Sequence, residues 1–266
     1  MTRVVRPPDR GRVRAVRLLI VALAGVLIGL GSFAIVSAVT TPRRTTPVYD
    51  PPVLAGQQIP GYCSGGVYAR HGQAIVLTTS PHCAGEGAVA YDPGRTTVQG
   101  VFGPTARDAT CAYAGYTCAA SDMNYLVVAP DRIPWGHLNV VDLGTAGYRV
   151  IAAGTTPLGC ADIAIGDPVE IDGRNVYRSG TVEEKSEHLP QPQDGSYFPC
   201  MIAARVPVGG GDSGGVVLVR DIPAGVTSRN FGGWLGFTPL AEGMAQLGLD
   251  LCTTPNCELV PPEGSP

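Results

Sequence analysis

Short runs of apolar residues, or of alternating apolar and polar residues, recur along the chain from about Tyr62 onward. Turn signals such as Asp92-Pro93-Gly94 separate them. Runs of this length and spacing predict about eleven β-strands and therefore an all-β domain. A single helix is predicted over Leu240–Leu249, where three apolar residues have near-helical spacing. The strands are predicted in the runs GGVYA, AIVLTT, GAVAYD, TVQGVFG, YLVVAP, YRVIAAG, DPVEID, SGTVEE, MIAARVPV, GVVLVR and FGGWLGFT.

An uncharged segment precedes these runs. Residues 18–40 contain no charged side chain and are numerous enough to cross a bilayer as a helix. Six arginines precede the segment and two follow it, so the positive-inside rule places residues 1–17 in the cytoplasm and the chain after residue 40 outside. The sequence predicts a single-pass protein of the cell membrane, or a secreted one if cleavage follows Val36-Ser37-Ala38. Residues 41–60 are typical of a Pro/Thr-rich stalk, and residues 61–266 form the predicted extracytoplasmic domain.

Charge and cysteine content narrow the functional classes. The net charge is −3 and the only basic cluster lies at the N-terminus, so no nucleic-acid partner is expected. The chain has eight cysteines, and an even number beyond an export signal predicts disulfides. No Cys-x-x-Cys occurs, and no cysteine pair has a histidine pair at zinc-finger spacing, so we expect no metal and no other cofactor.

The segment Gly211-Asp212-Ser213-Gly214-Gly215 is the sharpest chemical signal in the sequence. Glycines on both sides of a serine allow a tight turn, in which the backbone N–H groups of Gly211 and Ser213 converge on one point and form a candidate oxyanion hole. A serine becomes a nucleophile only when a neighbouring base accepts its proton. Without such a base, the segment is a glycine-rich hairpin that contains a serine by chance.

A candidate base and a candidate acid are both present. His82 follows the apolar run at residues 74–79 and precedes Cys83. Asp122 lies just before the apolar run at residues 124–128. A buried acid on the far ring nitrogen of His82 would fix its tautomer and stabilise the imidazolium. Asp122 is favoured by its position at the head of a strand, and three other acids remain as alternatives: Asp108, Asp131 and Asp142.

These segments resemble the chymotrypsin-like serine proteases, and most closely the small secreted bacterial members. The order His82, Asp122, Ser213 matches the chain order of that family. The resemblance implies two packed six-stranded antiparallel Greek-key β-barrels followed by a short C-terminal helix, with the first barrel at about 61–142 and the second at about 143–250. It also implies a serine endopeptidase that cleaves peptides or proteins through an acyl-enzyme. Proline at position 81 departs from the family, which usually has alanine or glycine there, and it removes a backbone donor.

The resemblance also implies that Cys63 pairs with Cys83. Proximity along the chain favours two further disulfides, which leaves one last pair for the second barrel. The pairs proposed in this way are Cys111 with Cys118, Cys252 with Cys257, and Cys160 with Cys200.

Asp212 requires a partner, because a buried unpaired carboxylate is unfavourable. Bacterial members of the family supply an internal arginine, and the segment at residues 172–182 resembles the one that carries it. We therefore expect Arg174, or as second choice Arg178, to pair with Asp212. The sequence gives little information on substrate preference. Pro207 stands at the position that usually forms the floor of the substrate pocket in this family, and the lack of an acid there argues against a preference for Lys or Arg.

Two rival interpretations use the same residues. The α/β-hydrolases share the Gly-x-Ser-x-Gly pattern, but their histidine follows the serine, whereas every histidine here precedes Ser213. The second rival is a pseudoprotease that acts as an extracytoplasmic binding domain, for which Pro81 and the poorly defined pocket are the only support.

Overall fold

The computed structural model describes residues 53–59, 63–92, 96–113, 116–119, 121–173, 176–191, 196–253 and 257, without the side chains of 108–117 and 187–196. The predicted cytoplasmic tail and membrane span, and most of the predicted stalk, lie outside these residues. Among the residues described, no helix is both long and apolar enough to cross a membrane.

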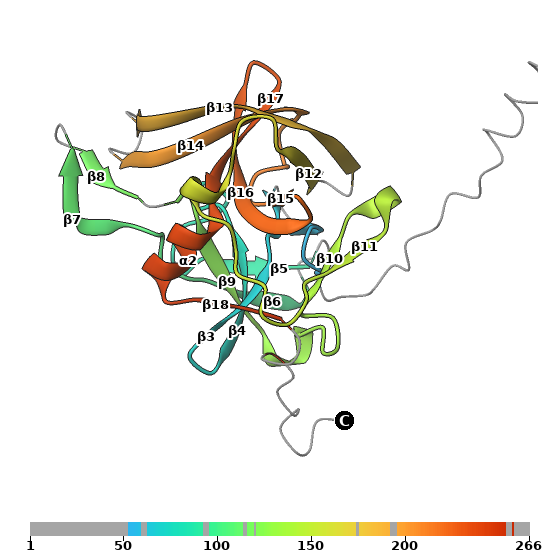
Figure 1. The fold of residues 1–266 in the computed structure, drawn as a ribbon. Coiled ribbons are helices and arrows are strands. Elements are labelled where there is room, and N and C mark those ends of the chain that lie inside the picture. The colour runs from blue at the N-terminus through green and yellow to red at the C-terminus, as the bar shows by residue number, and fades with distance from the viewer. Residues whose placement is uncertain are drawn as a thin grey trace, which may run out of the picture. The chain divides into compact units, whose positions relative to one another are not determined.

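Six strands form a closed antiparallel barrel in the C-terminal half. They are paired in the order β13-β12-β15-β16-β17-β14, and a direct pairing of β13 with β14 closes the ring. The interior contains the alternate apolar side chains of these strands, for example Val169 and Ile171 of β12 and Leu235 and Phe237 of β17. The barrel strands are β12 (Pro168–Gly173), β13 (Val176–Gln191), β14 (Ser196–Pro207), β15 (Val216–Val219), β16 (Ile222–Phe231) and β17 (Trp234–Pro239). They lie together in the upper part of Figure 1.

A second sheet of six strands lies below the barrel in Figure 1. Its order is β18-β3-β4-β9-β6-β5, and no pairing among the described residues joins its two edge strands. The strands are β3 (Tyr68–His71), β4 (Ala74–Thr79), β5 (Val89–Tyr91), β6 (Val98–Phe102), β9 (Asn124–Val128) and β18 (Asp250–Leu251). One apolar core contains side chains of this sheet, such as Leu77 and Leu126, together with Val216 and Val226 of the barrel. The barrel and the sheet therefore share an apolar interface.

The remaining elements are short. They are β1 (Gln58–Ile59) paired with β2 (Cys63–Ser64), β10 (Val140–Asp142) paired with β11 (Tyr148–Val150), and the 3₁₀ turns η1 (Pro130–Arg132), η2 (Gly144–Ala146) and η3 (Cys160–Asp162). A further hairpin consists of β7 (Asp108–Tyr113) and β8 (Tyr116–Cys118). It falls in the range expected for the first barrel, but β8 pairs in parallel with β14 and so extends the sheet of the second barrel.

The helix α2 covers Leu240–Leu247, within the range predicted from its spacing. Its buried side chains include Leu240 and Met244, as the pattern predicted. The helix ends two residues before the predicted end, because Gly248 has a φ of 64° and its N–H bonds back to the last turn.

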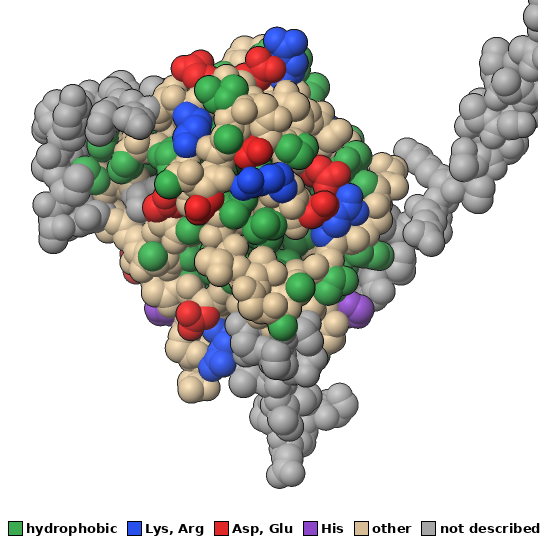
Figure 2. Space-filling view, in the orientation of Figure 1, with side chains coloured by type: hydrophobic (Ala, Val, Ile, Leu, Met, Phe, Trp, Pro, Cys, Tyr) green, Lys and Arg blue, Asp and Glu red, His purple; other side chains and the backbone are tan. Residues whose placement is uncertain are grey.

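Three disulfides join the pairs proposed from the sequence: Cys63 with Cys83, Cys160 with Cys200, and Cys252 with Cys257. Cys118 is also disulfide-bonded, and the side chain of Cys111, its proposed partner, lies outside the description. On the face in Figure 2, acidic and basic side chains are interspersed rather than gathered into a patch of one sign.

Candidate active site

The ends of two neighbouring strands bring the candidate base and acid together. In the antiparallel pair β4–β9, Thr79 lies opposite Asn124. The residues just after β4 therefore lie beside those just before β9, and His82 and Asp122 belong to these two segments. Nδ1 of His82 lies 3.3 Å from Oδ2 of Asp122, and the side chains are 47% and 9% exposed. The imidazole is thus open to solvent on one side, while the acid is buried.

Hydroxyl groups and a backbone contact hold Asp122 in place. Ser228 of β16 donates to Oδ2 of Asp122 at 2.6 Å. The backbone N–H of Asp122 donates to Oγ1 of Thr238 at 3.0 Å, and that hydroxyl also lies 2.8 Å from the hydroxyl of Ser121. Because Ser228 and Thr238 come from the barrel, the acid is fixed at the interface between the two sheets.

Sequence reasoning singled out none of these hydroxyls, nor that of Ser80. Its Oγ lies 2.6 Å from Nδ1 of His82 and 3.1 Å from Oδ2 of Asp122. In the sequence, Ser80 is recognisable only as a hydroxyl residue two positions before His82. Its role becomes apparent only when Asp122 is known to lie beside Ser80.

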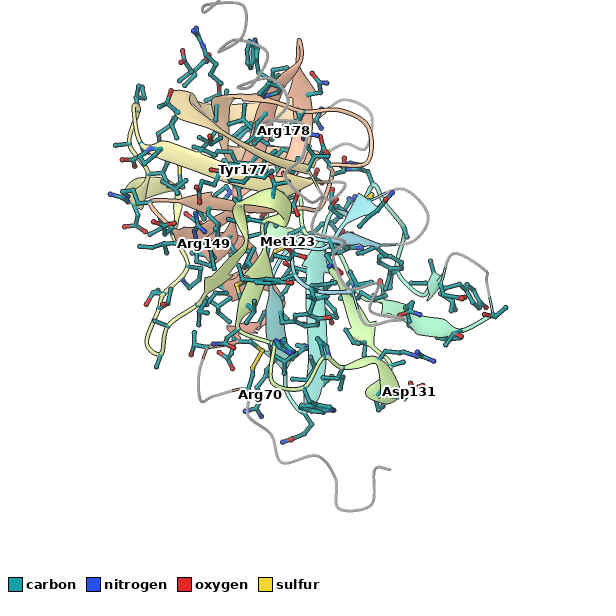
Figure 3. All side chains as sticks on the ribbon, turned by 90° about the vertical axis from the view of Figure 1, so that its right-hand side faces the viewer. Arg70, Met123, Asp131, Arg149, Tyr177 and Arg178 are labelled. Atoms are coloured by element: carbon teal, nitrogen blue, oxygen red, sulfur yellow. A yellow bond between two sulfur atoms is a disulfide. The ribbon has the colours of Figure 1, made fainter. Side chains whose placement is uncertain are left out.

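The alternative acids lie in other surroundings. Asp142 is buried and accepts hydrogen bonds from Gln57 and from the backbone of Gly144. Asp131 is an exposed residue of η1, ion-paired with Arg132; Figure 3 shows it well apart from Met123, the neighbour of Asp122. The side chain of Asp108 is outside the description. Among the described acids, Asp122 is the one beside His82.

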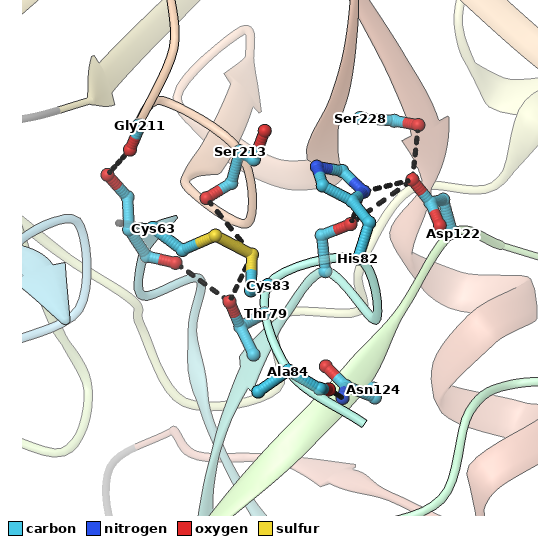
Figure 4. The surroundings of a disulfide bond; sticks show 12 residues. Cys63, Thr79, His82, Cys83, Ala84, Asp122, Asn124, Gly211, Ser213 and Ser228 are labelled. Carbon is cyan, nitrogen blue, oxygen red and sulfur yellow. Dashed lines mark hydrogen bonds and ion pairs between the residues drawn. A yellow bond between two sulfur atoms is a disulfide. The ribbon is translucent and has the colours of Figure 1, made fainter. Parts of the chain in front are cut away.

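The loop between β14 and β15 contains Ser213 and is called the serine loop; it is anchored to β2. The backbone N–H of Ser64 donates to the carbonyl of Ser213 at 2.7 Å, and Oγ of Ser64 donates to the carbonyl of Gly211 at 3.0 Å. The disulfide between Cys63 and Cys83 then ties β2 to the residue after His82. Figure 4 shows Ser213 and Asp122 on opposite sides of His82. The fold thereby brings together three residues that are far apart in the sequence.

Among the described residues, Oγ of Ser213 and the ring of His82 form no hydrogen bond. Hydrogen bonds of this kind are commonly long or misaligned in free enzymes and tighten when substrate binds. No backbone carbonyl in the part of the chain that the structure describes accepts a hydrogen bond from the N–H of Gly211 or of Ser213.

Asp212 is 1% exposed and accepts two hydrogen bonds on Oδ2. Nη1 of Arg178 and the backbone N–H of Gly209 each lie 2.7 Å from this oxygen. The arginine comes from β13, and Figure 3 places it on the barrel next to Tyr177. The second-choice arginine thus makes the contact, and the first choice, Arg174, lies outside the described residues. This ion pair fixes the loop immediately before Ser213.

Comparisons with known proteins agree with this architecture. No family model matches the sequence, and no curated protein sequence matches it. Solved structures do match: Thermobifida fusca protease A (20% identity, TM-score 0.57), a Cellulomonas bogoriensis chymotrypsin (21%, 0.54) and a Nocardiopsis protease (19%, 0.56). Each match covers 76% of this chain and 100% of the other chain. The chain resembles the bacterial chymotrypsin-like serine proteases and has the chymotrypsin-like fold.

Asp172 is another buried acid near the serine loop of this chymotrypsin-like fold. Asp172, at the end of β12, is 1% exposed. Burial and the nearby charge of Asp142 raise the pKa of Asp172 from 3.8 to about 7, while the positive charge of Arg178 opposes this rise. Sequence reasoning did not single out Asp172, because its isolation in the core depends on the packing of β12 against the serine loop.

Pro207, which the sequence places at the floor of the substrate pocket, is the last residue of β14 in the closed barrel. Pro207 pairs with Trp234, the first residue of β17, which is 44% exposed. Beside this pair, the backbone N–H of Val208 donates to the carbonyl of Gly233. The guanidinium of Arg205 lies 5.9 Å from the ring of Trp234. An apolar surface with a neighbouring cation is therefore available close to the serine loop.

Proposed function

We propose that this protein is a serine endopeptidase that uses Ser213 as nucleophile, His82 as general base and Asp122 as the residue that orients His82. Oγ of Ser213 attacks a peptide carbonyl while Nε2 of His82 accepts its proton. The same proton then passes to the leaving amine, which departs and leaves an acyl-enzyme. In the second half of the cycle, water attacks the ester while His82 accepts a proton from it. The bond between the acyl carbon and Oγ then breaks, His82 returns the proton to Oγ, and the free acid leaves.

The backbone N–H groups of Gly211 and Ser213 are the proposed oxyanion hole. During attack, the carbonyl oxygen acquires negative charge, and preorganised donors stabilise it more in the transition state than in the substrate. The hydrogen bond from Oγ of Ser64 to the carbonyl of Gly211 at 3.0 Å supports this role, because it restrains the backbone between the two proposed donors.

The observation that carries the proposal is the contact between His82 and the buried Asp122. Nδ1 of His82 is 3.3 Å from Oδ2 of Asp122, and Ser213 is anchored on the other side of the same imidazole. An acid that is 9% exposed and accepts a hydrogen bond from Ser228 is suited to stabilise an imidazolium.

The finer architecture and the location belong to the same proposal. We take the sheet β18-β3-β4-β9-β6-β5 as the first of two packed barrels, because it shares an apolar core with β15 and β16. Residues 18–40 are proposed to be a membrane span or export signal that places the domain outside the cytoplasm. The disulfides support this placement, since such bonds persist in oxidising compartments.

A fluorophosphonate probe, which labels activated serines, tests the proposal. We expect stoichiometric labelling of the folded wild-type domain and none of Ser213→Ala. Ser186→Ala is the matched control, because Ser186 is a strand residue whose hydroxyl donates to Glu184, and it should label like the wild type. Folded wild-type protein that is not labelled would favour a binding domain without catalytic activity.

A further inference from the structure

Ser80 links the candidate base to its acid. The residue is fully buried, and its Oγ lies 2.6 Å from Nδ1 of His82 and 3.1 Å from Oδ2 of Asp122. The direct separation of Nδ1 and Oδ2 is 3.3 Å, which is longer than an ordinary N–H···O hydrogen bond. Each of the two contacts made by Ser80 is shorter than this direct separation, so hydrogen bonds of ordinary length connect the imidazole to the carboxylate through the hydroxyl of Ser80.

The neighbouring proline explains why a hydroxyl is needed here. Pro81 separates Ser80 from His82 and has no backbone N–H. The segment that faces Asp122 thus lacks one main-chain donor that any other residue at position 81 would provide. Ser80 supplies a side-chain donor to the same carboxylate from the adjacent position.

Counting protons decides which group donates to which. An ionised carboxylate only accepts, and a hydroxyl has a single proton to donate. A hydrogen bond to a charged acceptor is about twice as strong as one between neutral groups, so the proton of Ser80 belongs to the bond with Asp122. Oγ of Ser80 must then accept from Nδ1, which places the neutral ring's proton on Nδ1. Nε2 is left with its lone pair, as a base requires.

We propose that Ser80 is a positioning residue that sets the tautomer of His82, by accepting from Nδ1 while donating to Asp122. This inference rests on the proposed function, since the tautomer matters only if His82 is the base. It assigns to Ser80 the coupling that a direct His82–Asp122 bond would otherwise provide. When His82 takes up a second proton, the dipole of the hydroxyl remains correctly oriented toward the imidazolium, so no group has to turn during the reaction.

Nitrogen-15 NMR of the folded domain with labelled histidine tests the tautomer without reference to activity. At a pH where the ring is neutral, we expect His82 to carry its proton on Nδ1, with the His82 signal assigned by its loss in His82→Gln. A wild-type His82 protonated mainly on Nε2 would overturn the proposal, and this measurement needs no variant of Ser80.

Variants then separate Ser80 from the other donor to Asp122. Ser80→Ala should shift part of the His82 population to the Nε2–H tautomer and slow fluorophosphonate labelling by about 10- to 100-fold, less than the roughly 10⁴-fold effect of a fully wrong tautomer. Ser80→Thr, which keeps the hydroxyl, should restore the tautomer and most of the lost rate. Ser228→Ala is the matched control, because it removes a hydroxyl from the same oxygen, Oδ2 of Asp122, without touching the ring; it should leave the tautomer unchanged.

The outcomes for the two proposals are distinguishable. If the wild type is not labelled but His82 shows the expected Nδ1–H tautomer that Ser80→Ala disturbs, the proposed function fails and the role of Ser80 stands. If the wild type is labelled and a folded Ser80→Ala keeps both the tautomer and the labelling rate, the enzyme stands and the role of Ser80 is rejected.

Discussion

Nη1 of Arg178 lies 2.7 Å from Oδ2 of Asp212, the residue immediately before the candidate nucleophile. Asp212 is 1% exposed and Arg178 is 22% exposed, so this ion pair is largely shielded from water. The link fixes the serine loop from the barrel side, whereas Ser64 fixes it from the other side. The geometry of the candidate nucleophile therefore depends on an arginine that acts through the neighbouring Asp212.

Removing Arg178 should affect stability and activity together. Arg178→Ala leaves the carboxylate of Asp212 buried without its cation, and we expect a loss of about 2–4 kcal/mol in the free energy of unfolding. Labelling of Ser213 should slow by at least about tenfold, because the loop loses its support. Denaturant unfolding and fluorophosphonate labelling measure the two effects.

Two other arginines serve as controls for this prediction. Arg205 forms an exposed pair with Glu183, and Arg205→Ala should change the free energy of unfolding by less than about 1 kcal/mol. Arg174→Ala should resemble Arg205→Ala. A severe effect of Arg174→Ala combined with a mild effect of Arg178→Ala would contradict the assignment of the partner.

The pattern of the sequence was sufficient for the all-β class. His82 and Asp122 were grouped because each flanks an apolar strand and because their order resembles that of a known family, whereas the pairing of their strands could not be derived, since four other strands separate β4 from β9 along the chain. The sequence could not decide between Arg174 and Arg178, because they are four residues apart and have the same parity along a strand. The observed hydrogen bond from Arg178 to Asp212 identifies the partner.

Other features depend on tertiary contacts that no local pattern encodes. The role of Ser80 requires knowing that Asp122 lies beside it. The hairpin at residues 108–118 joins β14 through a parallel pairing between segments about 80 residues apart. Such non-local pairings depend on which edge strands of the β-sheets still have unpaired backbone groups when the rest of the molecule has folded.

Asp172 should make the folded protein less stable as the pH rises. Its pKa is 3.8 in the unfolded reference and about 7 in the fold. Between these values, the folded protein keeps a proton that the unfolded chain releases, so the free energy of unfolding falls as the pH increases from about 4 to 7 and then levels off. The difference corresponds to about 4 kcal/mol.

Asp172→Asn should remove this dependence. The free energy of unfolding should match that of the wild type near pH 4 and exceed it by a few kcal/mol at pH 8, as measured by denaturant titrations at both pH values. Asp131→Asn changes an acid whose side chain is 71% exposed and should give a curve parallel to that of the wild type. A parallel curve for Asp172→Asn as well would show that Asp172 is ionised throughout.

The serine loop should not tolerate a side chain at Gly214. This residue has a φ of 83°, and an added Cβ would lie 2.5 Å from the carbonyl oxygen of Ser64. Gly214→Ala should therefore abolish labelling of Ser213 and lower the melting temperature. Gly210→Ala is the control, because a Cβ there meets no atom within 4 Å, and it should label normally. Equal labelling of the two variants would mean that the loop is looser than its contacts indicate.

The disulfide between Cys63 and Cys83 should matter more for activity than the one between Cys252 and Cys257. The first joins the segment that anchors Ser213 to the residue after His82 and has a sequence separation of 20, whereas the second has a separation of 5. Replacing both cysteines of the first pair by serine should cost about 3 kcal/mol and slow labelling strongly. The same change in the second pair should leave labelling within about threefold of the wild type. Comparable labelling losses in both double variants would contradict this ranking.

The central claim is that Ser213 forms an acyl-enzyme with a peptide carbonyl. Acid quenching of the wild-type domain during turnover of a mixed peptide library, followed by peptide mapping with mass spectrometry, tests this claim most directly. The account predicts an acyl adduct on the peptide that contains Ser213, absent from Ser213→Ala together with all peptide cleavage. Cleavage that persists in Ser213→Ala, or an adduct that maps to another residue, would contradict it.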